Sequence, residues 1–582
     1  MPDDPAKKRK GCLIVAIVLL LLLLIPVTLF WLMVRSFEQR ETHVDGGSVL
    51  EINLSELSGE GPAEIDFGPL FSVPLFSLWE LGRVIDHAAT DDDIVAVRLL
   101  PSGASVGWAA AEEILSHLDS FRDSDKPVHA LLESDIVVDL EYFLATGADR
   151  IRVPAESAAA INGLATEAHF YRGTLDKLHI EPQVFMYKEY KSAGEAYANY
   201  EMSPYMRESL EVLLEATHDR FVERVSERRG LPIDSIHAFL DRGLAPARAL
   251  VEAGLVDNLG FREDLEEELG GIDGSDGYRG ISVGDYLASL PDTTRRGEQI
   301  ALVFGEGPVV TRASSSLFPL LSTRILAGNR VAADIREATA DDRVRAIVFR
   351  VNSPGGSVLG SDLVRRAVVS AQAAGKPVVV SMSDMAASGG YWVSMEADAI
   401  VAQATTITGS IGVLFTKLNL DGFFAWLGTH VERVATSPAA DVLSTGPLDE
   451  SEEAGIRAWM DEVYASFTGH IATARGLDPE KVQEIARGRV WSGQDALELG
   501  LVDRLGGLRE AFEIAKEKAG LDPLVEYGVT VFPRPRSLFT RLFEGDLEAP
   551  SMPILERSAL IEWARGLAAP QVQARAPHIR LH

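Results

Sequence analysis

Short apolar runs rich in β-branched residues alternate along this chain with longer stretches whose apolar residues recur at helical spacing. The runs at 94–98, 346–351 and 377–382 predict buried strands, because a strand covered on both faces is apolar throughout. The stretches at 109–121 and 361–374 predict helices with one apolar face. Strands and helices in alternation predict an α/β fold built on a largely parallel sheet.

The pattern of the first half of the chain returns in the second half. Two long helical patterns, at 203–229 and 449–475, are separated by 246 positions, since 449 − 203 = 246. The segments LVDNLG at 255–260 and LVDRLG at 501–506 keep the same offset, since 501 − 255 = 246. Self-similarity at a fixed offset indicates repeated structural units. We therefore predict two copies of one α/β domain.

The chain divides into five predicted parts. The two copies span 45–295 and 296–520. Before them lie a short N-terminal segment, 1–11, and an apolar segment, 12–34. The tail, 521–582, is weakly patterned, and we assign it no function.

The apolar segment 12–34 predicts an N-terminal transmembrane helix. About 20 apolar residues cross the hydrocarbon core of a bilayer, and this run is slightly longer. The basic residues 7–10 before it predict a cytoplasmic N-terminus, with the rest of the chain outside the cytoplasm. A cleavable signal peptide is the alternative, but the segment ends in FWLMVRSFEQRE, which offers no small-x-small cleavage site. We therefore expect an uncleaved, single-pass anchor.

Charge and cysteine content restrict the classes of function. The chain has 86 acidic and 55 basic residues and a net charge of −31, which repels nucleic acid, so we expect no nucleic-acid partner. Cys12 is the only cysteine, so neither an intrachain disulfide nor a cysteine-based metal cluster can form. We expect no metal and no cofactor.

Two glycine-containing junctions in the second copy each connect a predicted strand to a predicted helix. They read NSPGGS at 352–357 and SDMAASGGY at 383–391. Such junctions leave backbone N–H groups unpaired, and glycine lets them approach a substrate carbonyl, so the pair can form an oxyanion hole. Ser388 is then placed as a nucleophile. The alternative is that these small residues only allow close packing of a helix on a strand, which is their commoner use.

A serine nucleophile needs a base, and the sequence contains no His-Glu-x-x-His motif. A lysine can serve when burial lowers its pKa from about 10.4 toward about 7 or 8. Lys191, in YKEYKSA at 187–193, has aromatic and small neighbours that suit such a site. Physical reasoning alone does not select Lys191 over Lys188 or over many other basic residues, most of which are expected to be solvated.

At these residues the chain resembles the signal peptide peptidase A family, in its long, internally duplicated bacterial form. The likeness covers about residues 10–520 and includes several motifs in order: NSPGGSV, MAASGGYW, TGSIGV, TSPAADV, EYKSA with the MSP that follows it, and WSGQDALELGLVDRLG. The resemblance implies tandem duplicated domains with a fold similar to that of Clp protease and the crotonases. It also implies peptide-bond hydrolysis by a Ser/Lys dyad.

The resemblance implies a role for each candidate site residue. Ser388, in the Ala-Ser-Gly-Gly motif, corresponds to the nucleophile, and Lys191, in the Tyr-Lys-Ser motif, corresponds to its base. Ser410, in the Thr-Gly-Ser-Ile-Gly motif, would orient the lysine. The N–H groups of Gly356 and Gly389 would form the oxyanion hole.

The family likeness also implies partners and a location. The substrates would be cleaved signal peptides and other unfolded or membrane-derived apolar peptides. The chain would form a homo-oligomer, a tetramer, on the outer side of the bacterial inner (cytoplasmic) membrane. Whether Ser388 meets Lys191 of its own chain or of a neighbouring chain is left open.

The duplication offers an independent check on the dyad. The offset is 249 in the upstream part of each copy, so Ser388 corresponds to Asp139, since 388 − 139 = 249. The second copy reads TSPAAD at 436–441 in the region that corresponds to Lys191, without a lysine. Each copy therefore keeps one half of the dyad and lacks the other half. This pattern predicts one composite site per chain, built between the two copies.

Two other classes of function stay open at this point. A crotonase-like acyl-coenzyme A enzyme would share the fold and its glycine-rich oxyanion hole. The predicted membrane anchor argues against this class, since coenzyme A thioesters are cytoplasmic, and so does the pairing of Ser388 with Lys191. A non-catalytic membrane scaffold would keep the same residues as structural remnants.

Overall fold

The structure is a computed structural model, and it describes residues 44–62, 65–66, 75–272, 277–291, 297–312, 324–437, 439–522, 527–534, 536–537 and 571–575. The predicted anchor at 12–34 lies outside these residues. None of the helices in these ranges is long and apolar enough to cross a bilayer.

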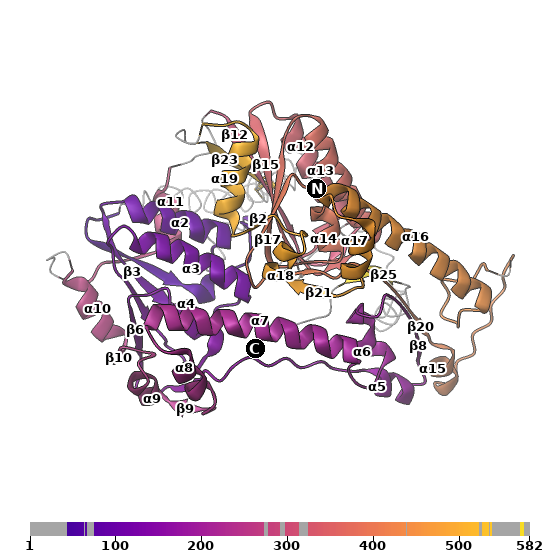
Figure 1. Ribbon diagram of the computed structural model, residues 1–582, viewed down its shortest axis with the longest axis horizontal. Helices are drawn as coiled ribbons and strands as arrows, with labels where there is room; N and C mark the ends of the chain where they lie inside the picture. Colours follow the sequence, from indigo (N-terminus) through magenta and orange to yellow (C-terminus); the bar gives the residue numbers. More distant parts are fainter. Residues whose placement is uncertain are drawn as a thin grey trace, which may run out of the picture.

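The first repeat is built on a six-stranded parallel sheet in the order β10-β6-β4-β3-β1-β11 (Figure 1). Its strands are β1 (Ser48–Asn53), β3 (Ile94–Leu100), β4 (Val128–Leu131), β6 (Arg150–Val153), β10 (Asn258–Leu259) and β11 (Gly280–Ser282). Its helices are α2 (Leu78–Thr90), α3 (Trp108–Arg122), α4 (Asp139–Ala145), α7 (Pro204–Arg229), α8 (Ile233–Leu240), α9 (Ala247–Glu252), α10 (Arg262–Gly270) and α11 (Val283–Ser289).

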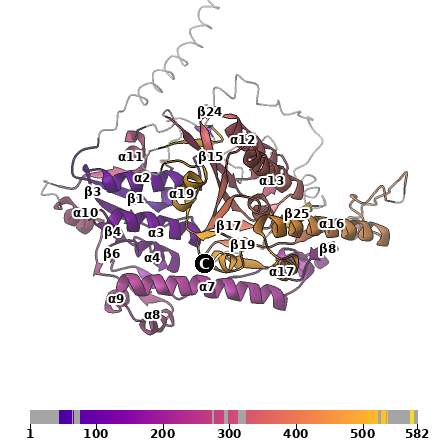
Figure 2. The ribbon, with the colours of Figure 1, turned by 45° about the horizontal axis from the view of Figure 1, so that its top comes forward.

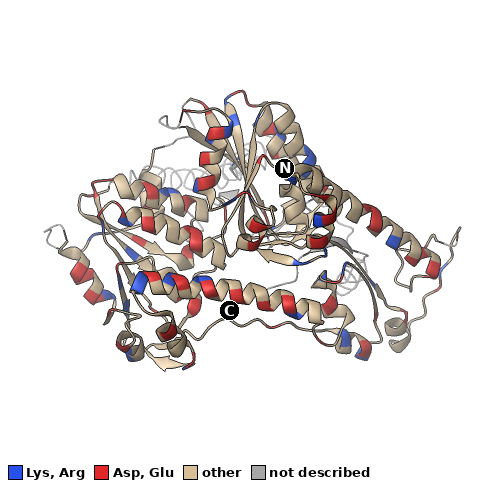
Figure 3. Cartoon of the chain, in the orientation of Figure 1, with Lys and Arg blue, Asp and Glu red and all other residues tan. Residues whose placement is uncertain are grey.

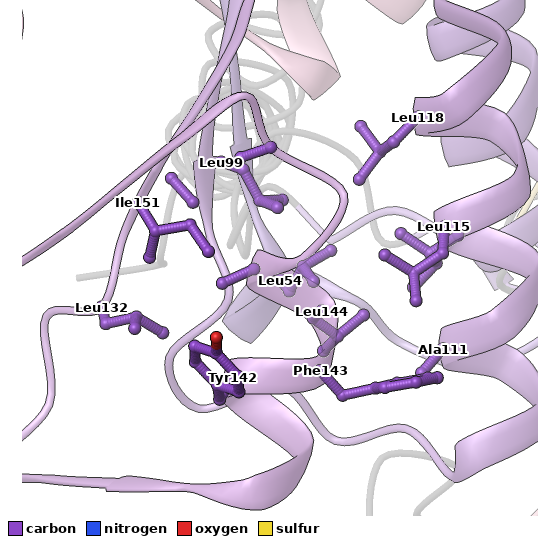
Figure 4. Close-up of a cluster of buried hydrophobic side chains, with 14 of the residues drawn as sticks. Leu54, Leu99, Ala111, Leu115, Leu118, Leu132, Tyr142, Phe143, Leu144 and Ile151 are labelled. Carbon is purple, nitrogen blue, oxygen red and sulfur yellow. The ribbon is translucent and has the colours of Figure 1, made fainter. Parts of the chain in front are cut away.

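The core of the first repeat lies between this sheet and the helices that cover it. Figure 4 shows Leu99 of β3, Leu115 and Leu118 of α3, and Tyr142 and Phe143 of α4 gathered in one cluster, and all of them are buried. Burial of apolar area on this scale is the main force that stabilises such a repeat.

The second repeat has a larger sheet in the order β21-β19-β17-β15-β12-β23, in which β18 also pairs with β17 and β22 pairs with β18. Its strands are β12 (Gln299–Glu306), β15 (Val344–Ser353), β17 (Val378–Ala387), β18 (Ala399–Ala402), β19 (Ile407–Gly409), β21 (Val490–Ser492), β22 (Arg504–Leu505) and β23 (Gly528–Phe532). Its helices are α12 (Gly328–Ala340), α13 (Val358–Ala373), α14 (Gly389–Ser394), α16 (Glu450–Arg475), α17 (Pro479–Ile485), α18 (Gly493–Glu498) and α19 (Leu508–Lys518). All pairings in this sheet are parallel except that of β19 with β21.

Equivalent contacts in the two repeats support the duplication. The Oη of Tyr142 donates to the carbonyl of Leu255 at 2.8 Å, and the Oη of Tyr391 donates to the carbonyl of Leu501 at 2.9 Å. Helices α7 and α16 each have 26 residues and end at a glycine in the left-handed conformation. The predicted mixture of strands and helices is therefore confirmed, and most predicted strands and helices lie within a few residues of the observed ones. The strand β23 lies in the tail 521–582 and adds an edge strand to the second sheet.

A third sheet combines strands of both repeats in the order β14-β13-β16-β25-β20-β8. These strands are β14 (Leu326–Ala327), β13 (Val309–Val310), β16 (Gly355–Gly356), β25 (Gln571–Arg575), β20 (Val413–Asn419) and β8 (Glu181–Tyr187). Strand β8 of the first repeat is antiparallel to β20 of the second, so the segment after β8 is held against the second repeat.

The remaining described elements are short. The strands are β2 (Ile65–Asp66), β5 (Ile136–Val138), β7 (Ala158–Ala160), β9 (Ala245–Pro246) and β24 (Arg536–Ser537). The helices are η1 (Leu54–Glu56), α5 (Arg172–Lys177), η3 (Ser192–Gly194), α6 (Glu195–Ala198) and α15 (Asp421–Trp426).

Helix α7 connects the two repeats. In Figures 1 and 2 it runs along one edge of the molecule, from α6 to α4 and α8. Phe221, in its second half, packs in the core of the first repeat. Leu213, nearer its start, packs in a buried cluster with Ala387, Ile407 and Val490 of the second repeat. Helix α7 therefore packs against the end of β17. Its outer face carries both acidic and basic residues (Figure 3).

A buried charge cluster also joins the repeats. Arg350 of β15 is fully buried; its Nε donates to Glu60 at 2.8 Å and its Nη2 donates to Glu113 of α3 at 2.6 Å. Next to this cluster, the carboxylate of Asp384 on β17 accepts the N–H groups of Gly107 and Ala110, at the start of α3. Strands β15 and β17 of the second repeat are thus fixed directly to a helix of the first repeat.

Replacing Arg350 with methionine is expected to lower the stability of the protein by about 3–5 kcal/mol, because Glu60 and Glu113 would stay buried without their cationic partner. Urea unfolding of the full chain measures this change. The control is Arg345→Met, which breaks the exposed ion pair with Glu298 and should cost at most about 1 kcal/mol. Equal losses in the two variants would contradict a structural role for the buried cluster.

Candidate active site

Ser388 lies at a sharp junction between β17 and α14. Its backbone angles are φ 57° and ψ −111°, which a non-glycine residue rarely adopts, and its N–H donates to the carbonyl of Gly409 at 2.7 Å. Strained conformations of this kind occur mainly at functional sites, where the surrounding structure holds them in place. The conformation turns the chain abruptly, so that Ser388 stands at the start of α14 and outside the regular strand.

Lys191 reaches Ser388 from the other repeat. It follows β8 and directly precedes η3, and its side chain is 1% exposed. Its Nζ lies 2.6 Å from the Oγ of Ser388. The structure therefore brings together, within one chain, the two residues that the sequence separates by 197 positions.

Ser410 completes the surroundings of the lysine. The Nζ of Lys191 donates to the carbonyl oxygen of Ser410 at 2.7 Å and to its Oγ at 3.0 Å. Strands β17 and β19 are parallel, and their last residues, Ala387 and Gly409, lie opposite each other. The residues that follow them, Ser388 and Ser410, are therefore also neighbours. The register of two neighbouring strands thus places both serines around one amine.

Burial changes the acid–base chemistry of this amine. Removal from water lowers the pKa of Lys191 well below 10.5, because the charged ammonium loses its hydration. A neutral amine has two N–H groups and one lone pair. Ser410 offers two acceptors for the N–H groups, which leaves the lone pair for the hydroxyl of Ser388. The arrangement can therefore carry a proton from a serine to a lysine.

The two glycines predicted for the oxyanion hole lie next to each other. Gly356 is in β16, and Gly389 is the first residue of α14. A Cβ placed on Gly389 would lie 3.0 Å from the backbone N of Gly356, and a Cβ on Gly356 would lie 2.2 Å from the carbonyl oxygen of Val309. Only glycine fits at either position, and the two backbone segments approach each other beside Ser388.

A loop of the second repeat holds the backbone of Lys191. The carbonyl of Arg487 accepts the N–H of Tyr190 at 3.1 Å, and the N–H of Gly488 donates to the carbonyl of Ile411 at 2.9 Å. Gly488 has a φ of +87°, and a Cβ at this position would lie 2.5 Å from the backbone N of Lys191. The sequence prediction missed this loop. The available signal was a glycine between two arginines, in RGRVWS at 487–492, immediately before a strand.

Replacing Gly488 with alanine is expected to lower kcat by about 10–100-fold, because the added methyl group would displace the backbone of Lys191 and so its amine. Steady-state hydrolysis of a peptide ester measures the loss. The matched control is Gly476→Ala: Gly476 also has a positive φ, of +63°, but a Cβ there would meet nothing within 4 Å. This control should cost only about 1 kcal/mol of stability and leave kcat unchanged. A similar kcat for both variants would show that the close contact of Gly488 with Lys191 does not position the amine.

The first repeat has no serine at the position that corresponds to Ser388. Asp139 begins α4 there, is nearly buried, and accepts the N–H groups of Gly163 at 3.1 Å and Asn162 at 3.4 Å. Burial raises its pKa to about 6. In the second repeat, the exposed residues 436–437 and 439–440 follow α15. The two repeats are therefore chemically unequal at these corresponding positions.

Other lysines near the site have different surroundings. The Nζ of Lys188 lies 5.4 Å from the ring centres of Tyr187 and Tyr464, a cation–π arrangement. The buried Lys417 donates to the carbonyl of Val442 at 2.8 Å. Of these three lysines, Lys191 is the one whose amine contacts the hydroxyl of Ser388. Within the described ranges, no group of three or more His, Cys, Asp or Glu side chains could hold a metal ion.

Comparison with known proteins places this site in a family context. Residues 120–271 and 370–522 match the family model described as Peptidase family S49. "Protease 4" of Salmonella typhi is 35% identical over 76% of this chain and 72% of its own length. "Serine protease SPPA, chloroplastic" of Arabidopsis thaliana is 31% identical over 82% of this chain and 70% of its own length. "Putative signal peptide peptidase SppA" of Enterococcus faecium is 32% identical over 33% of this chain and 57% of its own length.

Proposed function

Because the chain belongs to peptidase family S49 and is a serine-type peptidase, we propose that it hydrolyses peptide bonds with Ser388 as nucleophile and Lys191 as general base. The observation that carries this proposal is the buried contact of 2.6 Å between the Nζ of Lys191 and the Oγ of Ser388. The acyl-coenzyme A and scaffold alternatives are not retained for a member of this family.

The reaction proceeds through an acyl-enzyme. The lone pair of neutral Lys191 accepts the hydroxyl proton of Ser388 while the Oγ forms a bond to the carbonyl carbon of the substrate. The resulting ammonium then gives this proton to the leaving amine as the peptide bond breaks. A water molecule next attacks the ester carbonyl while Lys191 accepts its proton, and the ammonium returns this proton to the Oγ of Ser388 as the ester bond breaks. Ser410 keeps the amine oriented through both steps, since two of its oxygens lie within 3.0 Å of the Nζ.

The oxyanion of each tetrahedral intermediate is stabilised by the N–H groups of Gly356 and Gly389. The close approach of their backbones, and the position of Gly389 directly after Ser388, support this role. Donors of this type contribute most when they are fixed before the reaction begins, and loss of one costs about 10²–10³-fold in kcat in other enzymes.

The substrates are cleaved signal peptides and other apolar or unfolded peptides that remain at a membrane. The name of the Enterococcus faecium relative, a putative signal peptide peptidase, supports this substrate class. The predicted anchor at 12–34 and the basic residues 7–10 support a site on the outer side of the bacterial cytoplasmic membrane, close to such peptides.

The test of this substrate class uses the full chain purified in detergent, incubated with a synthetic signal peptide and with a polar peptide of equal length. We expect cleavage within the apolar run of the signal peptide, identified by mass spectrometry of the products. Equal cleavage of the polar peptide would contradict the preference. Absence of cleavage of both peptides, by a chain that still hydrolyses a small peptide ester, would refute signal peptides as substrates.

The chain forms a homo-oligomer, with a tetramer as the expected state. Exposed apolar residues are concentrated on α15 and in the segment after it, which supports this proposal; they are called the apolar patch here and comprise Trp426, Leu427, Val431, Val434 and Leu443. Exposed apolar residues that gather in one region commonly mark interaction surfaces.

The double variant Trp426→Glu/Val434→Glu is expected to dissociate the oligomer, because it places two charges in this apolar patch. Light scattering on the detergent-solubilised chain would show a fall from about four protomer masses to one. An unchanged mass would exclude the patch as the interface, and a monomeric wild type would refute the oligomer itself.

A further inference from the structure

A strand from the C-terminal tail crosses the candidate active site. Strand β25 is antiparallel to β16 on one side and antiparallel to β20 on the other. Ala574 lies opposite Gly356, and Val572 lies opposite Phe415. In the order of the third sheet, β25 is the strand that connects β16 to β20.

Both strands that β25 connects border the catalytic groups. Gly356 of β16 lies beside Gly389, the residue that follows Ser388. Strand β20 begins directly after Gly412, where a Cβ would lie 3.2 Å from the Cδ of Lys191. One edge of the gap between β16 and β20 is therefore on the nucleophile side, and the other edge is on the side of the base.

Two strand edges that face one gap bind an extended backbone, because their N–H and C=O groups need partners in a β-ladder. A peptide substrate has such a backbone, and it must reach Ser388 through the same gap. Strand β25 is therefore placed where a substrate would be placed, and it makes the same type of main-chain contact.

We infer that residues 571–575 are an intramolecular ligand of the peptide-binding groove and compete there with peptide substrates. The inference rests on the proposed function, since it identifies the groove by the dyad. It gives the tail, to which the sequence assigned no function, a role in controlling access to Ser388.

Attachment to the chain makes this competition effective. The strand is connected to β24 through the 33 residues 538–570. A tethered ligand has an effective concentration of about 1 mM. If the free tail binds with a Kd of about 0.1 mM, the attached tail raises the apparent Kd of a competing peptide by about 10-fold.

The position of β25 can be tested without any measurement of activity. Thr416 lies opposite Gln571, and directly opposed residues of antiparallel strands have Cα atoms within disulfide distance. The test protein is the full chain with Thr416→Cys and Gln571→Cys, in a background of Cys12→Ser and Ser388→Ala. The first background change removes the native thiol, and the second prevents loss of the tail by cleavage. We expect mild oxidation to produce an intrachain disulfide, detected by mass spectrometry after digestion.

The matched control carries Gln573→Cys in place of Gln571→Cys. Gln573 lies opposite Leu414, so its distance to residue 416 is that of a diagonal neighbour, about 7–8 Å, which is too long for a disulfide. A disulfide in the test protein and little in the control supports the inference. Equal oxidation in both, no oxidation in either, or a disulfide only between chains would overturn it.

A binding measurement tests the competition itself. The full Ser388→Ala chain and the same chain ending at residue 569 are titrated into a fluorescein-labelled apolar peptide, with anisotropy as the readout. We expect the shortened chain to bind the peptide about 10-fold more tightly, and a synthetic peptide of residues 568–582 to displace the label. Equal affinity of the two chains would overturn the competition. If neither chain binds any apolar peptide while the disulfide forms, the proposed substrate class fails and the placement of the tail stands.

Discussion

Replacing Ser388 with alanine is expected to lower kcat by roughly 10⁵–10⁶-fold, because no other group could form the acyl-enzyme. The Oγ of Ser388 is the atom that the amine of Lys191 contacts at 2.6 Å, and the residue is fully buried at the junction of β17 and α14. The residual rate would come from binding and from the oxyanion donors, which alanine leaves in place. Hydrolysis of a fluorogenic peptide ester by the full chain measures the change.

A buried serine on the same helix provides the control. The Oγ of Ser394 donates to the carbonyl of Gly390 at 2.8 Å, within α14. Ser394→Ala should therefore keep kcat close to that of the wild type. If Ser388→Ala retained more than about one tenth of the activity while Ser394→Ala lost it, the nucleophile would be wrongly assigned.

Replacing Lys191 with methionine is expected to lower kcat by about 10²–10⁴-fold, the usual contribution of general acid–base catalysis. Methionine fills a similar volume without an amine. The activity of the wild type should rise with pH through the lowered pKa of Lys191, since only the neutral amine accepts a proton. The variant should lack this rise. The pH dependence of kcat/KM for both proteins, over a range in which they stay folded, measures the effect.

Lys188→Met provides the matched control, three positions away. The Nζ of Lys188 lies over the rings of Tyr187 and Tyr464, so this variant should keep both the activity and the pH profile of the wild type. A normal profile in Lys191→Met, or its loss in Lys188→Met, would assign the base to a different residue.

The amine of Lys191 should also make the free energy of unfolding depend on pH. Its folded-state pKa is lowered by burial, so below 10.5 the unfolded chain binds more protons at this position than the folded chain does. The contribution of Lys191 to stability therefore rises with pH between its lowered pKa and 10.5. The difference in free energy of unfolding, wild type minus Lys191→Met, should increase over this range. A difference independent of pH would show that the amine is already solvated in the folded protein.

The sequence was sufficient for the repeated α/β architecture, because apolar periodicity and a constant offset are local signals that survive in one chain. It was also sufficient to select Ser388 as a candidate nucleophile, since consecutive residues form the strand-to-helix junction with its two glycines. Lys191 was different: only its resemblance to a motif distinguished it from Lys188, and burial by a distant repeat is what sets its pKa. The complementary loss in the two copies predicted a composite site between the repeats, but the other contacts that depend on the docking of the repeats could not be predicted.

Two examples show this limit. Arg350 and Glu60 are 290 positions apart, and nothing near either residue indicates that they meet in the interior. Gly488 lies against the backbone of Lys191, which is far from it in the sequence, and the residues next to Gly488 indicate only a turn. The tail strand β25 was likewise unpredicted, because five residues without a clear apolar pattern acquire a partner only when β16 and β20 already exist.

The division of the dyad between the two repeats has a consequence for biosynthesis. The ribosome makes Lys191 long before Ser388, and the Arg487–Gly488 loop that holds the lysine backbone comes later still. A growing chain that has folded only its first repeat carries a base without a nucleophile. Hydrolytic chemistry can therefore begin only after nearly the whole polypeptide has emerged and its halves have docked. The order of the site residues along the chain therefore delays the assembly of the site during translation.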